Sequence, residues 1–151
     1  MQSGKLIPAK KILQTSLDGA KPNSPQVGEI HSLLGQVYRQ IGDLKRAGLH
    51  CSECLRIRQG FSDHRGIADI KGDIGELLVS AGFIDSARVF LADALGAKTM
   101  DYGCDDVEVA HSLCSMAKLL VKGEPKEAQR YLQEGEFYIS SSSLYSTLLK
   151  N

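Results

Sequence analysis

The chain has 151 residues, and its 18 basic and 18 acidic side chains leave a formal net charge of zero. Without a net charge, no overall field draws the chain to phosphate backbones or anionic lipid, so we expect neither nucleic acid nor a membrane as a partner. No apolar run approaches the roughly 18 residues of a membrane span, and the N-terminus lacks the apolar core of a signal peptide. A cytoplasmic, reducing location is therefore expected.

A leading helix is predicted over residues 3–18. Its apolar side chains recur at the spacing of one helical face, at Leu6, Ala9, Leu13 and Leu17. Residues 18–25, DGAKPNSP, then combine proline, glycine and asparagine and predict a connection. That connection ends at Pro25, a residue suited to the first turn of the next helix.

Three helix pairs follow, at about residues 26–60, 66–98 and 107–139. In the first pair, Ile30, Leu34 and Tyr38 lie on one helical stripe. Gly42 ends that helix, and a second helix returns antiparallel to it. Four consecutive serines after the third pair predict a loose join to a tail at 140–151. Residues 1–151 are thus interpreted as a single helical repeat domain.

The first two pairs are related by an offset of forty residues. Eight small or apolar positions recur at that interval, pairing Leu34, Gly35, Tyr38, Gly42, Leu44, Ala47, Cys51 and Cys54 with Ile74, Gly75, Leu78, Gly82, Ile84, Ala87, Leu91 and Ala94. An internal repeat of this length is typical of a helical solenoid, in which each pair packs on its neighbours. We therefore predict an all-α, right-handed solenoid of helical hairpins, with about three pairs and a leading helix.

The third pair departs from this spacing. Ala117 lies six residues before Gly123, whereas seven residues separate Gly35 from Gly42. The turn of the third pair is therefore predicted to be one residue shorter than the turns of the other two.

The repeat resembles the tetratricopeptide (TPR) family. The family pattern W-x2-L-G-x2-Y followed by A-x3-F is matched, with histidine for tryptophan and cysteine for phenylalanine, by His31, Leu34, Gly35, Tyr38, Ala47 and Cys51. The spacing of forty residues is similar to the long repeats of kinesin light chains and of Pins-type polarity adaptors. The resemblance spans roughly residues 5–139.

The resemblance implies a non-catalytic adaptor, scaffold or regulator that needs no cofactor or metal. Such arrays present a concave groove, built mainly from the first helix of each pair, to a peptide or helix of a partner protein. The groove would then be formed by Glu29, Ser32, Gln36, Arg39, Gln40, Asp69, Asp73, Glu76, His111, Lys118 and Lys122. Its acidic centre and more basic flanks favour a mixed-charge or basic-centred ligand. The alternative interpretation of each of these residues is a solvated helix face.

A thiol or zinc protein is a second hypothesis, because Cys51-x2-Cys54 lies beside His50 and precedes His64. Against it, both cysteines occupy repeat positions that are apolar elsewhere, where a free thiol is core filling. The carboxylates Asp69, Asp73 and Glu76 suggest a cation site or, equally well, a solvated face.

Sequence motifs of common enzyme classes are missing. No nucleophile elbow of the G-x-S-x-G kind and no phosphate-binding glycine loop occurs in the sequence, so we do not expect an enzyme. A further hypothesis is self-association into a homo-oligomer, because the end helices of an uncapped array leave an apolar face uncovered.

Overall fold

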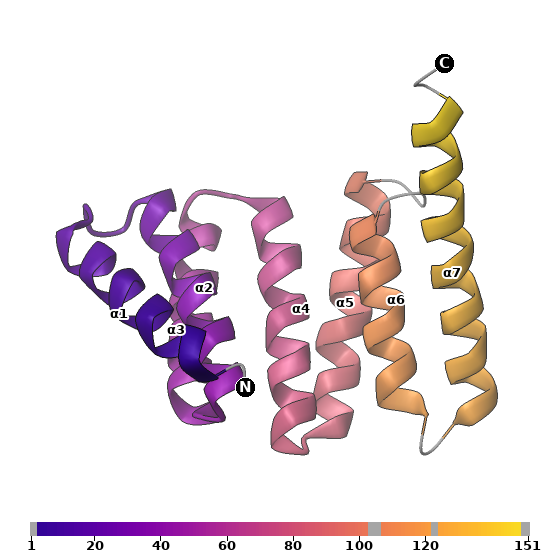
Figure 1. Cartoon of the computed structure of the whole chain (residues 1–151), viewed down its shortest axis with the longest axis horizontal. Helices are drawn as coiled ribbons and strands as arrows, with labels where there is room; N and C mark the ends of the chain where they lie inside the picture. Colours follow the sequence, from indigo (N-terminus) through magenta and orange to yellow (C-terminus); the bar gives the residue numbers. More distant parts are fainter. Residues whose placement is uncertain (1–2, 103–106, 122–123, 149–151) are drawn as a thin grey trace.

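The computed structural model describes residues 3–102, 107–121 and 124–148, with side-chain surroundings for 4–100, 109–121 and 124–136. Within these residues the chain forms only α-helices, which are stacked from α1 to α7 along the long axis of the molecule (Figure 1). They are α1 (Ser3–Gly19), α2 (Pro25–Ile41), α3 (Leu44–Gly60), α4 (His64–Ala81), α5 (Ile84–Tyr102), α6 (Val107–Leu120) and α7 (Pro125–Leu148). No helix in this part of the chain combines the length and apolar character that crossing a bilayer requires.

The helices pack as three antiparallel hairpins, α2 with α3, α4 with α5 and α6 with α7, preceded by α1. Each hairpin packs on the next through its second helix, α3 on α4 and α5 on α6, while α1 covers α2. The first helices also touch in succession, α2 with α4 and α4 with α6. The described residues therefore form the predicted all-α solenoid of helical hairpins.

Helix ends follow local sequence signals. The side chain of Ser24 accepts a hydrogen bond from the Val27 backbone N–H and caps α2, and Asp63 caps α4 in the same way through Gly66. Gly42 and Gly82 end α2 and α4 in the left-handed conformation, with φ of 91° and 83°. These two turns are equivalent, which confirms the offset of forty residues.

The repeat positions form the core. The small residues Ala47 and Ala87 are buried at equivalent places on α3 and α5. Cys51 and Leu91 are likewise buried, one turn further along. In the third hairpin Ala117 and Ala128 are buried, as are both Leu119 and Leu120. Gly123, which sets the expected shorter turn, lies outside the described residues.

Two helices are longer than expected from the sequence. Helix α5 continues to Tyr102, past the predicted end near residue 98. Helix α7 runs unbroken to Leu148, so the loose join expected at the four serines, and with it a separate tail from residue 140, is absent through that residue. Serine costs only about 0.5 kcal/mol relative to alanine inside a helix, which is less than the penalty of nucleating a new helix after a break.

Candidate functional site

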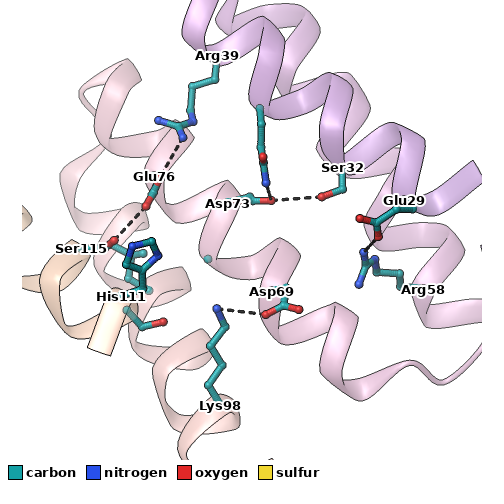
Figure 2. Close-up of a pocket in the computed structure, with 14 residues that line it drawn as sticks. Glu29, Ser32, Arg39, Arg58, Asp69, Asp73, Glu76, Lys98, His111 and Ser115 are labelled. Carbon is teal, nitrogen blue, oxygen red and sulfur yellow. Dashed lines mark hydrogen bonds and ion pairs between the residues drawn. The ribbon is translucent and has the colours of Figure 1, made fainter. Parts of the chain in front are cut away.

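A cavity of about 470 Å³ lies among the first helices α2, α4 and α6 (Figure 2). Its walls are polar, and Leu91 is the one large apolar side chain among the described residues that line it. Most of the groove residues expected from the sequence line this cavity, namely Glu29, Ser32, Gln36, Arg39, Asp69, Asp73, Glu76 and His111. The structure thus brings together residues that are up to 82 positions apart in the chain.

The other three expected residues lie elsewhere. Gln40 is exposed and does not line the cavity, because it follows Arg39 and is turned about 100° further around α2. Lys118 lines a smaller neighbouring hollow that it shares with Arg39 and Glu76. Lys122 lies outside the described residues.

Arg58 and Lys98 are cavity residues that the sequence analysis missed, because they come from the second helices α3 and α5. They are forty positions apart and therefore equivalent in the repeat. Each lies four residues, about one helical turn, after a buried small residue, Cys54 or Ala94. A basic residue recurring at this position was the signal that could have identified them.

Three ion pairs join described cavity-lining residues across different helices. Arg58 Nη2 lies 2.8 Å from Glu29 Oε2, and Arg39 Nη2 lies 2.9 Å from Glu76 Oε2. Lys98 Nζ lies 3.2 Å from Asp69 Oδ1, a buried oxygen that accepts no hydrogen bond from the described residues. Figure 2 draws this contact. The last contact is thus an ion pair without hydrogen-bond geometry.

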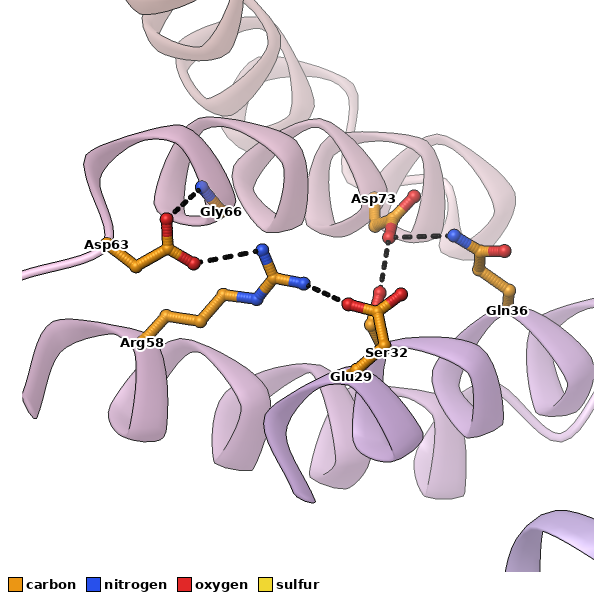
Figure 3. Close-up of polar contacts among 7 residues, drawn as sticks. All are labelled: Glu29, Ser32, Gln36, Arg58, Asp63, Gly66 and Asp73. Atoms are coloured by element: carbon orange, nitrogen blue, oxygen red, sulfur yellow. Dashed lines mark hydrogen bonds and ion pairs between the residues drawn. The ribbon is translucent and has the colours of Figure 1, made fainter. Parts of the chain in front are cut away.

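Arg58 also connects two repeats. Its Nη1 atom lies 3.4 Å from Asp63 Oδ2, while Asp63 Oδ1 accepts a hydrogen bond from the Gly66 N–H (Figure 3). A side chain at Gly66 would overlap the Arg58 guanidinium. One arginine of α3 therefore holds Glu29 of α2 and the N-cap of α4 together.

Asp73 is a half-buried carboxylate on the cavity wall. Its Oδ2 atom accepts hydrogen bonds from Gln36 Nε2 at 3.1 Å and Ser32 Oγ at 3.4 Å (Figure 3). Burial raises the pKa of Asp73, with the hydrogen bond from Gln36 acting in the opposite direction. The two donors join α2 to α4 at the centre of the array.

The cysteine-histidine cluster does not assemble into a site. Cys51 and Cys54 are buried in the core, and burial raises the pKa of Cys51 to about 12 and also raises the pKa of Cys54. His50 instead meets His31, with their Nδ1 atoms 2.8 Å apart. Within the described residues, no group of three or more potential ligands is placed to hold a metal ion. The arrangement favours the interpretation of both cysteines as core residues.

Comparison with known proteins identifies the fold. No protein-family model and no curated protein matches the chain. Among solved structures, the chain is similar to the crystal structure of BtubC (BKLC) from P. vanneervenii, with a TM-score of 0.76 and 18% sequence identity. The match covers 89% of this chain and 56% of BtubC, so the chain spans little more than half of that protein's length. This likeness, together with the hairpin repeat, shows that the chain has a TPR-like helical-repeat fold.

Proposed function

We propose that the chain is a non-catalytic protein-interaction module, an adaptor, scaffold or regulator that binds a peptide or helix of a partner in the polar cavity. The observation behind this proposal is that one cavity extends across the first helices of all three hairpins. Residues from successive repeats can thereby contact successive parts of one extended ligand. TPR-like folds offer this inner surface to other polypeptides.

The cavity chemistry favours a polypeptide over a small molecule or a reaction. Small-molecule sites are mostly apolar, whereas the lining of this cavity is predominantly polar. Ser115 donates its hydroxyl to Glu76 at 3.0 Å, and Glu76 is already paired with Arg39. Ser115 thus faces a carboxylate held by an arginine, whereas an activated serine needs a free base.

The repeat subtype and the cellular location of the chain are part of the same proposal. The turns at Gly42 and Gly82 repeat at forty residues, a spacing similar to the long repeats of kinesin light chains and Pins-type adaptors. The free cysteines Cys51, Cys54 and Cys114 are consistent with a reducing, cytoplasmic location.

Site-directed photo-crosslinking tests the proposal. A photoreactive amino acid at His111, which is exposed and lines the cavity, should capture a distinct partner from an extract of the source cells. The same group at Gln133, which is exposed on α7 and outside the cavity, is the matched control. Adducts that are identical from both positions, or none from His111, would contradict binding in the cavity.

Self-association is a second candidate function, and an observation on α1 favours it. The side chains of Ile7 and Ile12 are largely exposed on this end helix. A second copy could cover them, in which case sedimentation velocity would show concentration-dependent association that Ile12→Lys abolishes. A monomer throughout the concentration series would exclude this candidate.

A further inference from the structure

The three ion pairs of the cavity are unequal in exposure. The Glu29 side chain is 61% exposed and its partner Arg58 only 14%. Asp69 is 42% exposed against 7% for Lys98, and Glu76 is 39% exposed against 27% for Arg39. In each pair the cation is the more buried member. The carboxylates therefore form more of the charged surface that a ligand in the cavity would meet.

Asp73 adds to this asymmetry. The hydrogen bonds that it accepts come from the neutral donors Ser32 and Gln36. With it, four carboxylates and three cations line the described part of the cavity, which leaves one negative charge in excess. Arg39 and Lys98 already attract this carboxylate, and an external cation would stabilise it further, since the effective dielectric constant there is lower than in water.

We infer that the cavity receives a basic segment of the partner, with a lysine or arginine side chain lying against Asp73 between Asp69 and Glu76. This inference rests on the proposed function and specifies the chemistry of its ligand. An acidic segment would meet three ion pairs in which the carboxylate is more exposed than the cation. An apolar segment would displace water from these groups and would offer no hydrogen bonds in place of those that water had made.

The cations of the wall have a supporting role in this arrangement. Arg58 donates a hydrogen bond to Glu29 and so orients this carboxylate before a ligand enters, while Lys98 compensates part of the Asp69 charge. Preorganisation of this kind reduces the conformational cost of binding. The same cations repel a positive charge on the ligand and so limit the affinity of the cavity for it. Binding then depends on whether the ligand places its cation near the carboxylates.

Selection from a library of random linear peptides displayed on phage tests the inference. The probe is the selected peptide itself, synthesised in three forms that carry lysine, norleucine or glutamate at the selected basic position. Peptides enriched in lysine or arginine are expected. The norleucine and glutamate forms should each bind at least about tenfold more weakly than the lysine form, with a steep loss of lysine-peptide binding as salt rises.

Variants of the protein locate the contact. Asp73→Asn should weaken binding of the lysine peptide by about tenfold or more and leave binding of the norleucine peptide unchanged. Because burial raises the pKa of Asp73, the neutral amide is compatible with the folded state, which a thermal melt will verify. Asp18→Asn is the matched control, since it removes the same charge from an exposed site on α1.

The outcomes separate the two proposals. Selected peptides that bind in the cavity but show acidic, apolar or no charge preference would overturn the inference and leave the interaction function standing. Basic peptides that lose equal affinity with Asp73→Asn and Asp18→Asn would also overturn it, because they would be bound by overall charge alone. A library that yields no binder would count against the proposed function itself.

Discussion

A Cβ atom added to Gly75 would lie 2.6 Å from Leu91 Cγ and 3.3 Å from the Leu91 backbone nitrogen. Helices α4 and α5 therefore approach so closely here that a methyl group has no room. The same relationship occurs one repeat earlier, where a Cβ on Gly35 would lie 2.8 Å from Cys51 Sγ. The recurring glycine thus sets the distance between the two helices of a hairpin.

Gly75→Ala should lower the free energy of unfolding by about 1–3 kcal/mol, because the added methyl group overpacks the contact with Leu91. Urea denaturation followed by circular dichroism measures the change. Gly96→Ala on α5 is the control, since no atom of the described residues lies within 4 Å of its added Cβ. Gly96→Ala should raise the free energy of unfolding by up to about 1 kcal/mol, because alanine has a higher helix propensity than glycine. Equal stabilisation by both substitutions would refute the close contact.

Gly82→Ala should destabilise the protein by about 1–2 kcal/mol for a different reason, because φ is 83° at this helix end. Among the residues that the structure describes, none lies within 4 Å of the added Cβ, so the expected loss comes from the backbone conformation. Gly82→Asn should lose less than Gly82→Ala, since asparagine tolerates the left-handed region. Thermal unfolding of both variants makes the comparison, and equal losses would speak against a backbone origin.

Local signals explain which parts of the fold could be predicted from the sequence. Gly42 and Gly82 identify helix ends because a left-handed residue is needed there, and Ala47 and Ala87 identify the hairpin contacts because they must be small. Serine tracts are a weaker signal. The run in α7 lowers helix propensity only slightly, so it does not break a helix that is already formed.

The cavity residues of α2 could all be predicted, those of α4 and α6 only in part, since Gly72, Ser112 and Ser115 also line the cavity, and those of α3 and α5 not at all. Glu29 and Asp69 are equivalent repeat positions on first helices, and both line the cavity. Arg58 and Lys98 reach the cavity from the second helices with long side chains. Which acid each one pairs with depends on the packing between hairpins, and helical periodicity within one element does not contain that information.

Arg58→Gln should lower the free energy of unfolding by about 1–3 kcal/mol, because it removes charged hydrogen bonds from a mostly buried arginine that joins Glu29 to Asp63. Arg56→Gln is the matched control on the same helix. Arg56 pairs with Glu53 three positions away and also donates a hydrogen bond to Asn23, and all three side chains meet at the surface, so a loss of about 0–1 kcal/mol is expected. Chemical denaturation of the two variants should rank them in this order, and similar losses would show that Arg58 is no inter-repeat link.

Cys51 and Cys54 should be unreactive in the native protein, because burial raises the pKa of both thiols, that of Cys51 to about 12. A variant with Cys104→Ser and Cys114→Ser leaves only these two to react with an aromatic disulfide reagent. Labelling of the native protein should then be no faster than its unfolding. In urea, both thiols should be labelled completely. Rapid labelling of the folded protein, or zinc retained in elemental analysis, would instead support the thiol or zinc hypothesis.

Because of the His31–His50 pair, the protein should be less stable in mild acid than at neutral pH. Their Nδ1 atoms share one hydrogen bond at 2.8 Å, so one ring must accept while the other donates. Burial lowers the pKa of His31, with Glu53 opposing and Arg56 adding to the shift. Burial also lowers the pKa of His50, and His31 lowers it further.

Because the unfolded chain binds these protons more readily, stability is complete above the ordinary pKa of 6.5 and is lost as the pH falls from there through the lowered values. Urea midpoints at pH 7.5 and pH 5.5, which bracket the reference histidine pKa of about 6.5, should differ less for His50→Gln than for the wild type. His64→Gln, an exposed site, serves as the control and should keep the wild-type difference. A midpoint that stays constant, or rises, on acidification of the wild-type protein would rule out this role for the pair.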